Sequence, residues 1–305
     1  MPTSAHDRRP AEGTAAGLGY ALLAYGAWGL FPLFWKLLEH IPSLELVAHR
    51  VVWSCAAYLV LVLVRGRGGE LRRALVSGRT LRTIGPSALF IATNWLVFIY
   101  AVSTARVLHA SLGYFLNPLV SIVLGMVFLG ERLRPVQWVA VALACAGVVF
   151  MASLAEGFPW MGIVLAVTFG GYGLLRKVAP VDGLIGATME SVLLVPIGAV
   201  YLGVLAADGV GALGHQGLRI DSLLVSAGII TAAPLVWFAN AARLLTLRTL
   251  GFMQYLAPTG QFALAVLVFG ETLTPVHLRG FGCIWAAVAV FSVEGWWASR
   301  RRERA

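Results

Sequence analysis

The chain has 305 residues, and its composition is that of a membrane protein. Hydrophobic residues make up 59% of it and charged residues only 12%, whereas soluble domains have about 45–50% and about 25%. Together with a mean hydropathy of +0.83, these values exclude a disordered chain, a secreted disulfide scaffold and a soluble nucleic-acid-binding protein. The net charge of +9 does not indicate an acidic partner, because the basic residues cluster in short gaps between apolar runs, where they orient helices.

Ten apolar segments are long enough to cross a membrane, which takes about 20 residues per helix. The predicted spans are 18–38, 44–64, 84–104, 108–129, 136–152, 160–177, 184–205, 222–242, 250–270 and 276–296. The gaps are short except at 65–83 and 206–221, so no soluble domain fits between the spans. The first span is longer than the apolar region of a signal peptide, and we expect it to be retained.

The distribution of Lys and Arg predicts the orientation, because cytoplasmic loops carry an excess of positive charge. With the N-terminus inside, 18 of the 23 basic residues, Arg176 and Lys177 among them, fall in inside segments, and Arg50 lies within the second span. The outside gaps hold only Lys36, Arg106, Arg219 and Arg279. An even number of spans then places both termini in the cytoplasm of a cell-membrane protein.

The chain contains an internal repeat. A shift of 140 residues aligns 111–136 with 251–276, and the motif GERLRP at 130–135 becomes GETLTP at 270–275. The matched pairs are Leu116/Leu256, Pro118/Pro258, Leu124/Leu264, Gly130/Gly270, Glu131/Glu271, Leu133/Leu273, Pro135/Pro275 and Val136/Val276. Arg132 and Arg134 are replaced by Thr272 and Thr274, as expected if the same turn faces opposite sides of the membrane in the two halves.

A five-span repeat has an odd number of crossings, so its second copy must be inverted, as in many secondary transporters. We therefore predict an all-α integral membrane protein with ten transmembrane helices arranged as two inverted five-helix repeats. The expected boundaries are a cytoplasmic tail at 1–16, repeats at 17–155 and 156–297, and a basic tail at 298–305.

A small or polar stripe runs along the fourth and ninth spans. In the fourth span, one helix face carries Ser111, Tyr114, Pro118, Ser121 and Gly125. Its counterparts in the ninth are Gly251, Gln254, Pro258, Gln261 and Ala265. We favour a water-accessible cavity over close helix packing, because both glutamines are bulkier than packing requires. Each proline removes a backbone hydrogen bond, which predicts a kink in both spans.

Ionisable groups at membrane depth are candidate functional residues. Glu45 and His49 are four residues apart on one helix face and can pair, although Glu45 near a helix N-terminus is also favoured by the helix dipole. Arg50 could neutralise an anionic substrate, but we favour a structural pair with Glu190 or Glu45. Glu190 is deeper, and we expect it to couple protons or bind a cationic group. His49 could be a pH switch or a satisfied structural histidine.

The remaining polar residues have more ordinary explanations. Asn94 and Asn117 could donate into a cavity or join neighbouring helices, and Asn240 is a weaker candidate near a span end. Glu131 and Glu271 lie at glycine turns, where capping is expected. Five tryptophans at span ends are predicted to anchor the helices at the membrane–water interface: Trp35, Trp138, Trp160, Trp296 and Trp297.

Several blocks of the chain resemble the RarD branch of the EamA drug/metabolite transporter superfamily, whose members are often labelled chloramphenicol-sensitive proteins. The blocks are AYGAWGLFPLFWK at 24–36, ELVAHRVVWS at 45–54, TNWLVFIYAV at 93–102, HASLGYFLNPLVSIVLGMVFLGERL at 109–133, GGYGLLRK at 170–177 and TLGFMQYLAPT at 249–259. The resemblance implies paired inverted repeats around a central cavity, and export or exchange of small metabolites or drugs. Thr93 departs from the family, which usually has Gly before Asn-Trp.

The predicted function is secondary active transport by alternating access, coupled to a proton or substrate gradient, because no P-loop is present. The alternatives are an intramembrane enzyme or lipid-handling protein, for which H-E-x-x-H and G-x-S-x-G are absent, and a channel. We therefore expect no enzyme activity and no cofactor. We also expect no metal site, because Cys55, Cys145 and Cys283 lie in apolar runs and lack the spacing of metal ligands. The expected partners are a small-molecule substrate and membrane lipid, with no nucleic acid and with a homodimer left open.

Overall fold

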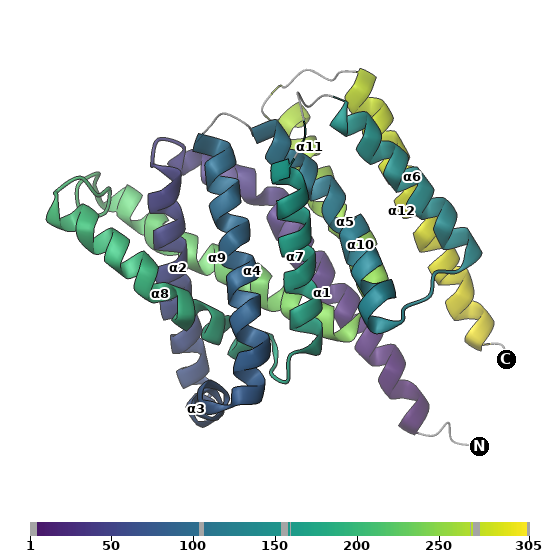
Figure 1. The fold of residues 1–305 in the computed structure, drawn as a ribbon, viewed down its shortest axis with the longest axis horizontal. Coiled ribbons are helices and arrows are strands. Elements are labelled where there is room, and N and C mark those ends of the chain that lie inside the picture. The colour runs from purple at the N-terminus through teal and green to yellow at the C-terminus, as the bar shows by residue number, and fades with distance from the viewer. Residues whose placement is uncertain are drawn as a thin grey trace.

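The computed structural model describes residues 5–103, 107–153, 158, 160–268, 270 and 275–303, and every element in these ranges is a helix (Figure 1). The first half contains α1 (Ala5–Trp35), the short η1 (Lys36–Leu38), α2 (Ser43–Val64), α3 (Gly68–Val76), α4 (Gly78–Ser103), α5 (Val107–Leu129) and α6 (Pro135–Ala152). The second half contains α7 (Trp160–Val178), α8 (Gly183–Ala207), α9 (Leu218–Leu244), α10 (Leu247–Gln254), α11 (Leu256–Leu267) and α12 (Pro275–Glu303).

The predicted ten-helix membrane fold is confirmed. By length and composition, 7 of the helices could each cross a membrane, and the remaining crossings are α4, α5 and the pair α10–α11. Apolar side chains cover much of the outer surface, with Leu63, Val64 and Phe128 exposed among many others. In water such a surface would drive aggregation, whereas it suits the hydrocarbon core of a bilayer.

Helix boundaries differ from the predicted spans in several places. The gap 65–83 contains α3, whose Leu71 and Ala74 are buried while Arg72 and Arg73 are exposed. α1 already begins at Ala5, inside the segment expected to be a tail, and α12 continues to Glu303. These extensions are polar helix ends, which a search for apolar spans cannot detect.

The ninth span is broken into α10 and α11 at Tyr255. Pro258 has no N–H to donate to the carbonyl of Gln254 four residues earlier, and its ring crowds that carbonyl. Tyr255 N–H instead donates to Phe252 O at 3.3 Å, and the helix restarts with Thr259 N–H donating to Tyr255 O at 3.1 Å. The kink predicted at Pro258 is thus an interruption of the helix. In contrast, α5 stays helical through Pro118.

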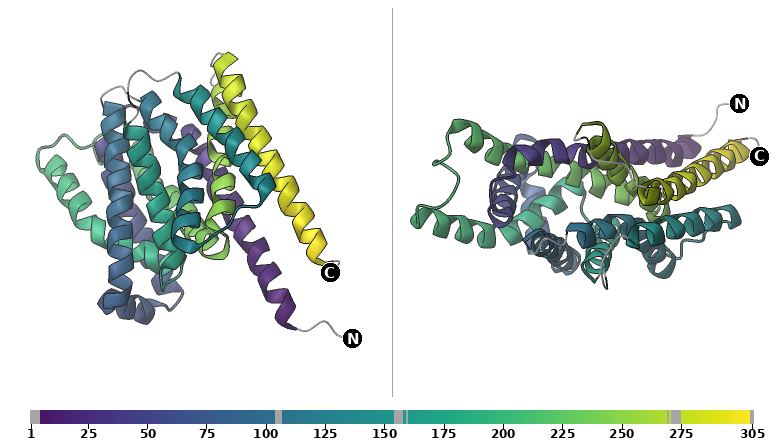
Figure 2. Two further views of the ribbon diagram at one scale, coloured as in Figure 1. Left: turned by 45° about the vertical axis from the view of Figure 1, so that its right-hand side comes forward. Right: turned by 90° about the horizontal axis from the view of Figure 1, so that it is seen from above.

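Helix packing follows the repeat. In chain order, the helices α1, α2, α4, α5 and α6 of the first repeat correspond to α7, α8, α9, α10–α11 and α12 of the second. The first helix of each repeat packs on the third and fourth helices of the other repeat: α1 packs on α9 and α11, and α7 packs on α4 and α5. Matched helices also pack on each other in the pairs α2–α8, α5–α10 and α6–α12, and the last of these pairs stands at one edge of the molecule (Figure 2). The core of the molecule is therefore the interface between the two repeats.

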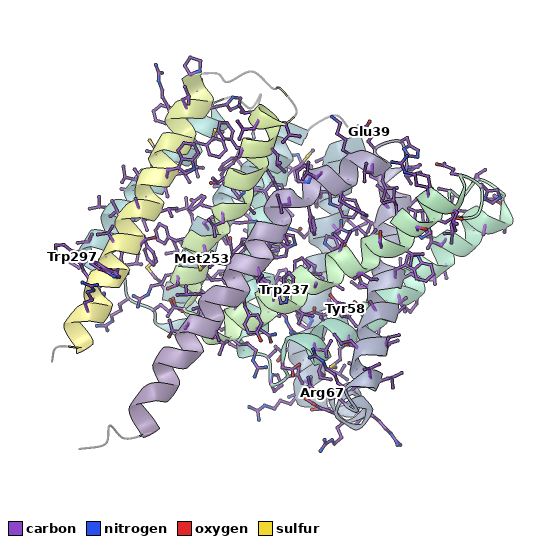
Figure 3. All side chains as sticks on the ribbon, turned by 180° about the vertical axis from the view of Figure 1, so that it is seen from behind. Glu39, Tyr58, Arg67, Trp237, Met253 and Trp297 are labelled. Atoms are coloured by element: carbon purple, nitrogen blue, oxygen red, sulfur yellow. The ribbon has the colours of Figure 1, made fainter. Side chains whose placement is uncertain are left out.

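The bundle has two ends. The beginning of α1, the end of α12 and the helix α3 lie toward the same end (Figure 1). Arg67 lies at this end, and Glu39 lies at the opposite one (Figure 3). We call these ends the Arg67 face and the Glu39 face. α2 runs from the Glu39 face to the Arg67 face, and α8 runs the other way.

Candidate functional site

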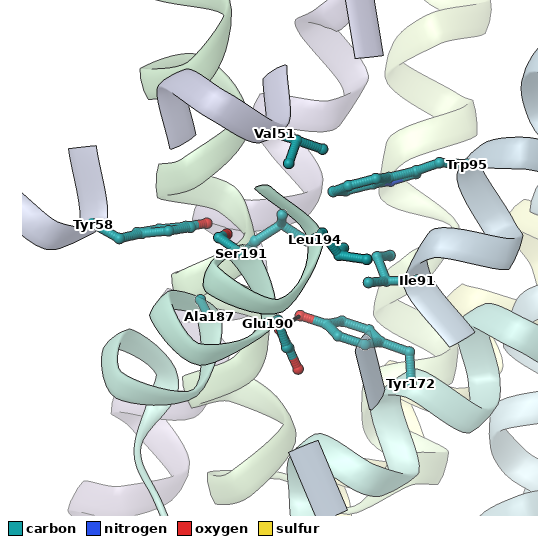
Figure 4. Close-up of a pocket in the computed structure, with 10 residues that line it drawn as sticks. Val51, Tyr58, Ile91, Trp95, Tyr172, Ala187, Glu190, Ser191 and Leu194 are labelled. Atoms are coloured by element: carbon teal, nitrogen blue, oxygen red, sulfur yellow. Dashed lines mark hydrogen bonds between the residues drawn. The ribbon is translucent and has the colours of Figure 1, made fainter. Parts of the chain in front are cut away.

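A small cavity lies between the two repeats and is lined by both (Figure 4). The lining residues come from α2, α4, α7, α8 and α9 and are Val51, Tyr58, Ile91, Trp95, Tyr172, Ala187, Glu190, Ser191, Leu194 and Leu235. Tyr58 and Tyr172 approach from opposite sides, each with its hydroxyl toward the turn of α8 that carries Glu190 and Ser191. The cavity volume is about 10 Å³, enough for one water molecule. The structure is therefore closed around this site.

Glu190 is the acidic group of this cavity. It is buried, about two turns inside α8, as expected from its depth in the sequence. Ser87 Oγ donates to Glu190 Oε1 at 2.6 Å, and Tyr172 Oη donates to Oε2 at 3.4 Å. Arg176 Nη1 lies 3.7 Å from Oε1. Glu190 thus links α4, α7 and α8 through charge and hydrogen bonds.

Arg176 is the partner of Glu190, and its side chain has no exposed surface. Its Nη2 donates to the carbonyls of Asp182 and Gly183 at 3.0 and 3.2 Å, while Nε has no hydrogen-bond partner in the part of the chain that the structure describes. A Cβ on Gly186 would lie 1.7 Å from Arg176 Nη1. The guanidinium therefore fits only because position 186 has no side chain. Counting basic residues assigned Arg176 to an inside loop, whereas the structure places it in the core.

Arg50 does not pair with Glu190 or Glu45, so the predicted structural pair is wrong. Its Nε donates to Thr231 Oγ1 at 3.1 Å. Its Cζ lies 5.0 Å from the ring centroid of Trp35 and 5.4 Å from that of Trp95. Within the described part of the chain, no carboxylate forms an ion pair with this guanidinium. Glu190 pairs with Arg176 instead because Arg176, unlike Arg50, lies within reach of it.

Glu45 and His49 form the expected pair near the Glu39 face. Glu45 Oε1 lies 3.8 Å from His49 Nε2, and it accepts a hydrogen bond from the N–H of Ala212 at 2.6 Å. His49 Nδ1 accepts from Trp53 Nε1 at 3.2 Å. Both side chains are buried. Glu45 thus fastens α2 of the first repeat to the α8–α9 loop of the second.

The polar stripe of α5 and α10 is filled by close packing, the alternative to the favoured cavity. Gln254 Nε2 donates to Ser121 Oγ at 3.1 Å, and both side chains are buried. A Cβ on Gly251 would lie 2.7 Å from Pro118 O, so the backbones touch here. Gln261 Nε2 donates to Trp28 O at 3.1 Å, whereas the buried Gln254 Oε1 has no hydrogen-bond partner among the described residues.

Other predicted residues mostly join helices. Asn94 Nδ2 donates to Leu165 O at 2.9 Å and Thr168 Oγ1 at 3.0 Å, which fastens α4 to α7. Asn117 is buried, and its Oδ1 has no hydrogen-bond partner within the described ranges. Tyr114 is partly exposed and lies close enough to Arg50 to interact with it. The Ser111 side chain lies outside the described residues.

The capping prediction is confirmed for Glu131, although the helix that it caps lies in the other repeat. Its carboxylate accepts from the N–H groups of Leu247 and Arg248 at 2.8 and 3.0 Å, at the start of α10. Asn240 Oδ1 accepts from Gly183 N at the start of α8. Glu271 lies outside the described residues.

The predicted anchor tryptophans divide into two groups. The exposed members at span ends are Trp138, Trp160, Trp296 and Trp297. Trp35 lies against Arg50 instead.

Polar links join the repeats at both faces, and one at each face ties α2 or the α2–α3 turn to the second repeat. At the Glu39 face this is Glu45 with Ala212, and at the Arg67 face Arg67 Nη2 pairs with Asp182 Oδ2 at 2.5 Å. Arg67 also pairs with Glu70 at 2.7 Å. Burial raises the pKa of Asp182, but hydrogen bonds from Ile185 N–H and Arg67 outweigh it and leave this pKa below its ordinary value. The carboxylate is therefore charged and holds α8 to the α2–α3 turn.

Sequence reasoning missed several residues of the site, among them Arg176, Trp35 and Trp95. Arg176 ends the motif GGYGLLRK, and the glycines at 183 and 186 that follow it were the available signal for a buried large side chain. Trp95 follows Asn94 in an otherwise apolar span, and nothing in the sequence distinguishes it from a lipid-facing ring. Its position against both Arg50 and the cavity depends on the fold.

Comparison with known proteins agrees with this geometry. Residues 15–153 match the EamA-like transporter family. The chain is 45% identical to an uncharacterized transporter of Pseudomonas aeruginosa, over 93% of this chain and 96% of that protein. It is 40% identical to the protein RarD of Escherichia coli, over 96% and 99%. It is also 35% identical to the chloramphenicol-sensitive protein RarD of Pseudomonas aeruginosa, over 92% and 94%.

The fold also matches a solved crystal structure, with a TM-score of 0.72 at 20% identity over 96% of this chain and 99% of that one. At this identity the likeness supports the fold alone. The relatives, in contrast, match the sequence over nearly its whole length and are themselves named as transporters or as RarD. The chain belongs to the RarD branch of the EamA family of membrane transporters.

Proposed function

We propose that this protein is a secondary active transporter that exports or exchanges a small metabolite or drug-like molecule across the cytoplasmic membrane by alternating access. The observation that carries the proposal is the closed cavity between the repeats, which is lined from both halves and contains the buried Glu190. Movement of one repeat against the other would enlarge this cavity toward one face at a time.

Polar links between the repeats at both faces support this mechanism. Arg67–Asp182 and Glu45–Ala212, for example, lie at opposite ends of the bundle, and both are formed in this structure. Opening toward one face requires the links at that face to break while those at the other face hold. The Arg67 face carries most of the positive charge, and we assign it to the cytoplasm on the positive-inside rule.

Glu190 is the proposed coupling residue. A buried carboxylate that exchanges partners as the cavity opens can take up or release a proton. Its partners Ser87, Tyr172 and Arg176 come from α4 and α7, so a shift of either helix against α8 changes the environment of the carboxylate.

The test is transport in proteoliposomes containing the purified protein. Labelled amino acids, nucleosides, organic acids and chloramphenicol are supplied outside, with and without the same unlabelled compound inside. Chloramphenicol is included because it appears in the name of a relative. A carrier shows saturable uptake and faster uptake against the unlabelled compound. Linear, non-saturating flux would indicate a channel, and no flux for any class would contradict the proposal.

A variant test addresses coupling. Glu190→Gln should keep exchange but lose transport driven by a pH gradient, whereas Glu39→Gln, which changes an exposed carboxylate at the bundle end, should keep both. Unchanged pH dependence in Glu190→Gln would remove Glu190 from the coupling role.

A further inference from the structure

The guanidinium of Arg50 combines deep placement with very few polar contacts. It lies about two turns inside α2 from the Glu39 face. An arginine has five N–H donors, and the contacts within the described residues use one of them, Nε to Thr231. No described carboxylate forms an ion pair with it. A charge at this depth is costly to leave without a counter-charge.

The surroundings of Arg50 are aromatic. Trp35 and Trp95 approach the guanidinium with their rings at 5.0 and 5.4 Å from Cζ, and the partly exposed Tyr114 lies nearby. Cation–π contacts of this kind stabilise the cation but do not neutralise it. Because Nε is engaged by Thr231, the outer edge with Nη1 and Nη2 is left for a ligand.

Trp95 connects Arg50 to the central cavity. Its ring lines the cavity that contains Glu190 and also lies against the guanidinium of Arg50. Trp95 thus lies between the guanidinium and the cavity, so under the proposed function Arg50 is placed beside the path from the Glu39 face to Glu190.

We propose that Arg50 is the binding site for the anionic group of the transported substrate, and that this substrate is a monoanionic carboxylate with an apolar body. The outer edge of the guanidinium matches the two oxygens of a carboxylate in a pair of parallel hydrogen bonds. The rings of Trp35 and Trp95 provide apolar contacts for the rest of the molecule. Arg176, the other cation beside the cavity, is already paired with Glu190. The uncompensated positive charge of Arg50 therefore matches a substrate with one negative charge.

The inference rests on the proposed transport function, but binding can be measured separately. The probes are cyclohexanecarboxylate and its neutral analogue of equal shape, cyclohexanecarboxamide, with inorganic phosphate as a second anion. Thermal unfolding of the full-length protein in detergent is recorded against the concentration of each probe, because a ligand of the folded state must raise the unfolding temperature. We expect a saturable rise of several degrees with the carboxylate and none with the amide.

The variants locate the site. Arg50→Gln should weaken cyclohexanecarboxylate binding by about tenfold or more, since charge-assisted hydrogen bonds are lost. Arg219→Gln removes an exposed positive charge near the start of α9 and should bind as the wild type does. If Arg50→Gln does not fold, Arg50→Lys keeps the charge but not the planar fork and should bind more weakly than the wild type. Equal stabilisation by acid and amide, or wild-type carboxylate binding in the Arg50 variant, would overturn the proposal. A response to phosphate alone would reassign the site to phosphate compounds and overturn the carboxylate class.

The same probes separate this inference from the transport proposal. Carboxylate binding at Arg50 without exchange in proteoliposomes would keep the site and refute the carrier. Saturable exchange with no preference for the acid over the amide would keep the carrier and refute the site.

Discussion

The buried pair of Glu190 and Arg176 allows a quantitative test of the site. The charged atoms are 3.7 Å apart, and Coulomb's law gives about 4.5 kcal/mol of attraction at an effective dielectric constant of about 20. The Arg176 side chain is fully buried, so removal of its partner leaves a cation that cannot lose its proton. Breaking such a pair typically costs about 3–5 kcal/mol, whereas replacing both partners is often close to neutral.

The perturbation is therefore a double-mutant cycle with Glu190→Gln, Arg176→Met and both together. Glu190→Gln alone should lower the free energy of unfolding by about 3–5 kcal/mol, which corresponds to a fall of about 5–8 °C in unfolding temperature for a chain of this length. Arg176→Met should cost less, because the remaining carboxylate can accept a proton. The double variant should recover most of the loss.

The assay is thermal unfolding of the purified protein in one detergent at neutral pH, with Glu39→Gln and Arg219→Gln as exposed controls. The free energy of unfolding of each control should stay within about 0.5 kcal/mol of the wild-type value. If the two single losses simply add in the double variant, the pair contributes no mutual stabilisation and the reasoning fails. The double variant also lacks a titratable group at the site, so it should fold and exchange substrate but not respond to a pH gradient.

Three further predictions follow from local geometry. Gly186→Ala should displace the buried guanidinium of Arg176 and lower the free energy of unfolding by more than about 3 kcal/mol, as measured by thermal unfolding. The control is Gly203→Ala in the same helix, where a Cβ meets nothing within 4 Å, and it should be neutral or slightly stabilising. Asp182→Asn keeps the cap of α8 but loses the charge paired with Arg67, and should cost under about 1 kcal/mol at neutral pH. Because the pKa of Asp182 is lowered in the folded state, this difference should vanish as the pH falls below about 4, which unfolding curves from pH 3 to 7 can measure. Glu131→Ala should cost about 1–2 kcal/mol by uncapping α10, with a smaller loss for Gln at this position, as measured by thermal unfolding.

The fold could be predicted from the sequence because a bilayer imposes a simple rule. Each crossing needs a long apolar run, and the ten predicted runs all correspond to helical crossings. The shift of 140 residues between GERLRP and GETLTP identified the duplication. α3 was missed because it is short and lies on the surface, where no apolar run is required. The break at Tyr255 was expected only as a kink, since a proline shows that a hydrogen bond is missing but not how the chain rearranges.

The site was less predictable, because it depends on contacts between distant segments. Depth along the helix correctly indicated that Glu190 is buried, yet the only partner considered for it was Arg50, because Arg176 was counted among the basic residues of the inside segments. Arg176 becomes the partner because Gly186 leaves room for a guanidinium. The polar stripe shows the same limit, since Gln254 can face water or hydrogen-bond Ser121, and only the position of the neighbouring helix decides.

The Arg67–Asp182 and Glu45–Ala212 links between the repeats differ in their exposure to water. Asp182 and Arg67 are partly exposed, with 34% and 26% of their side-chain surfaces accessible, so water and salt weaken their attraction. Glu45 is buried and accepts its hydrogen bond from Ala212 away from solvent, so breaking that bond without a substitute partner costs more. Of these two links, the one at the Arg67 face therefore requires less free energy to break than the one at the Glu39 face.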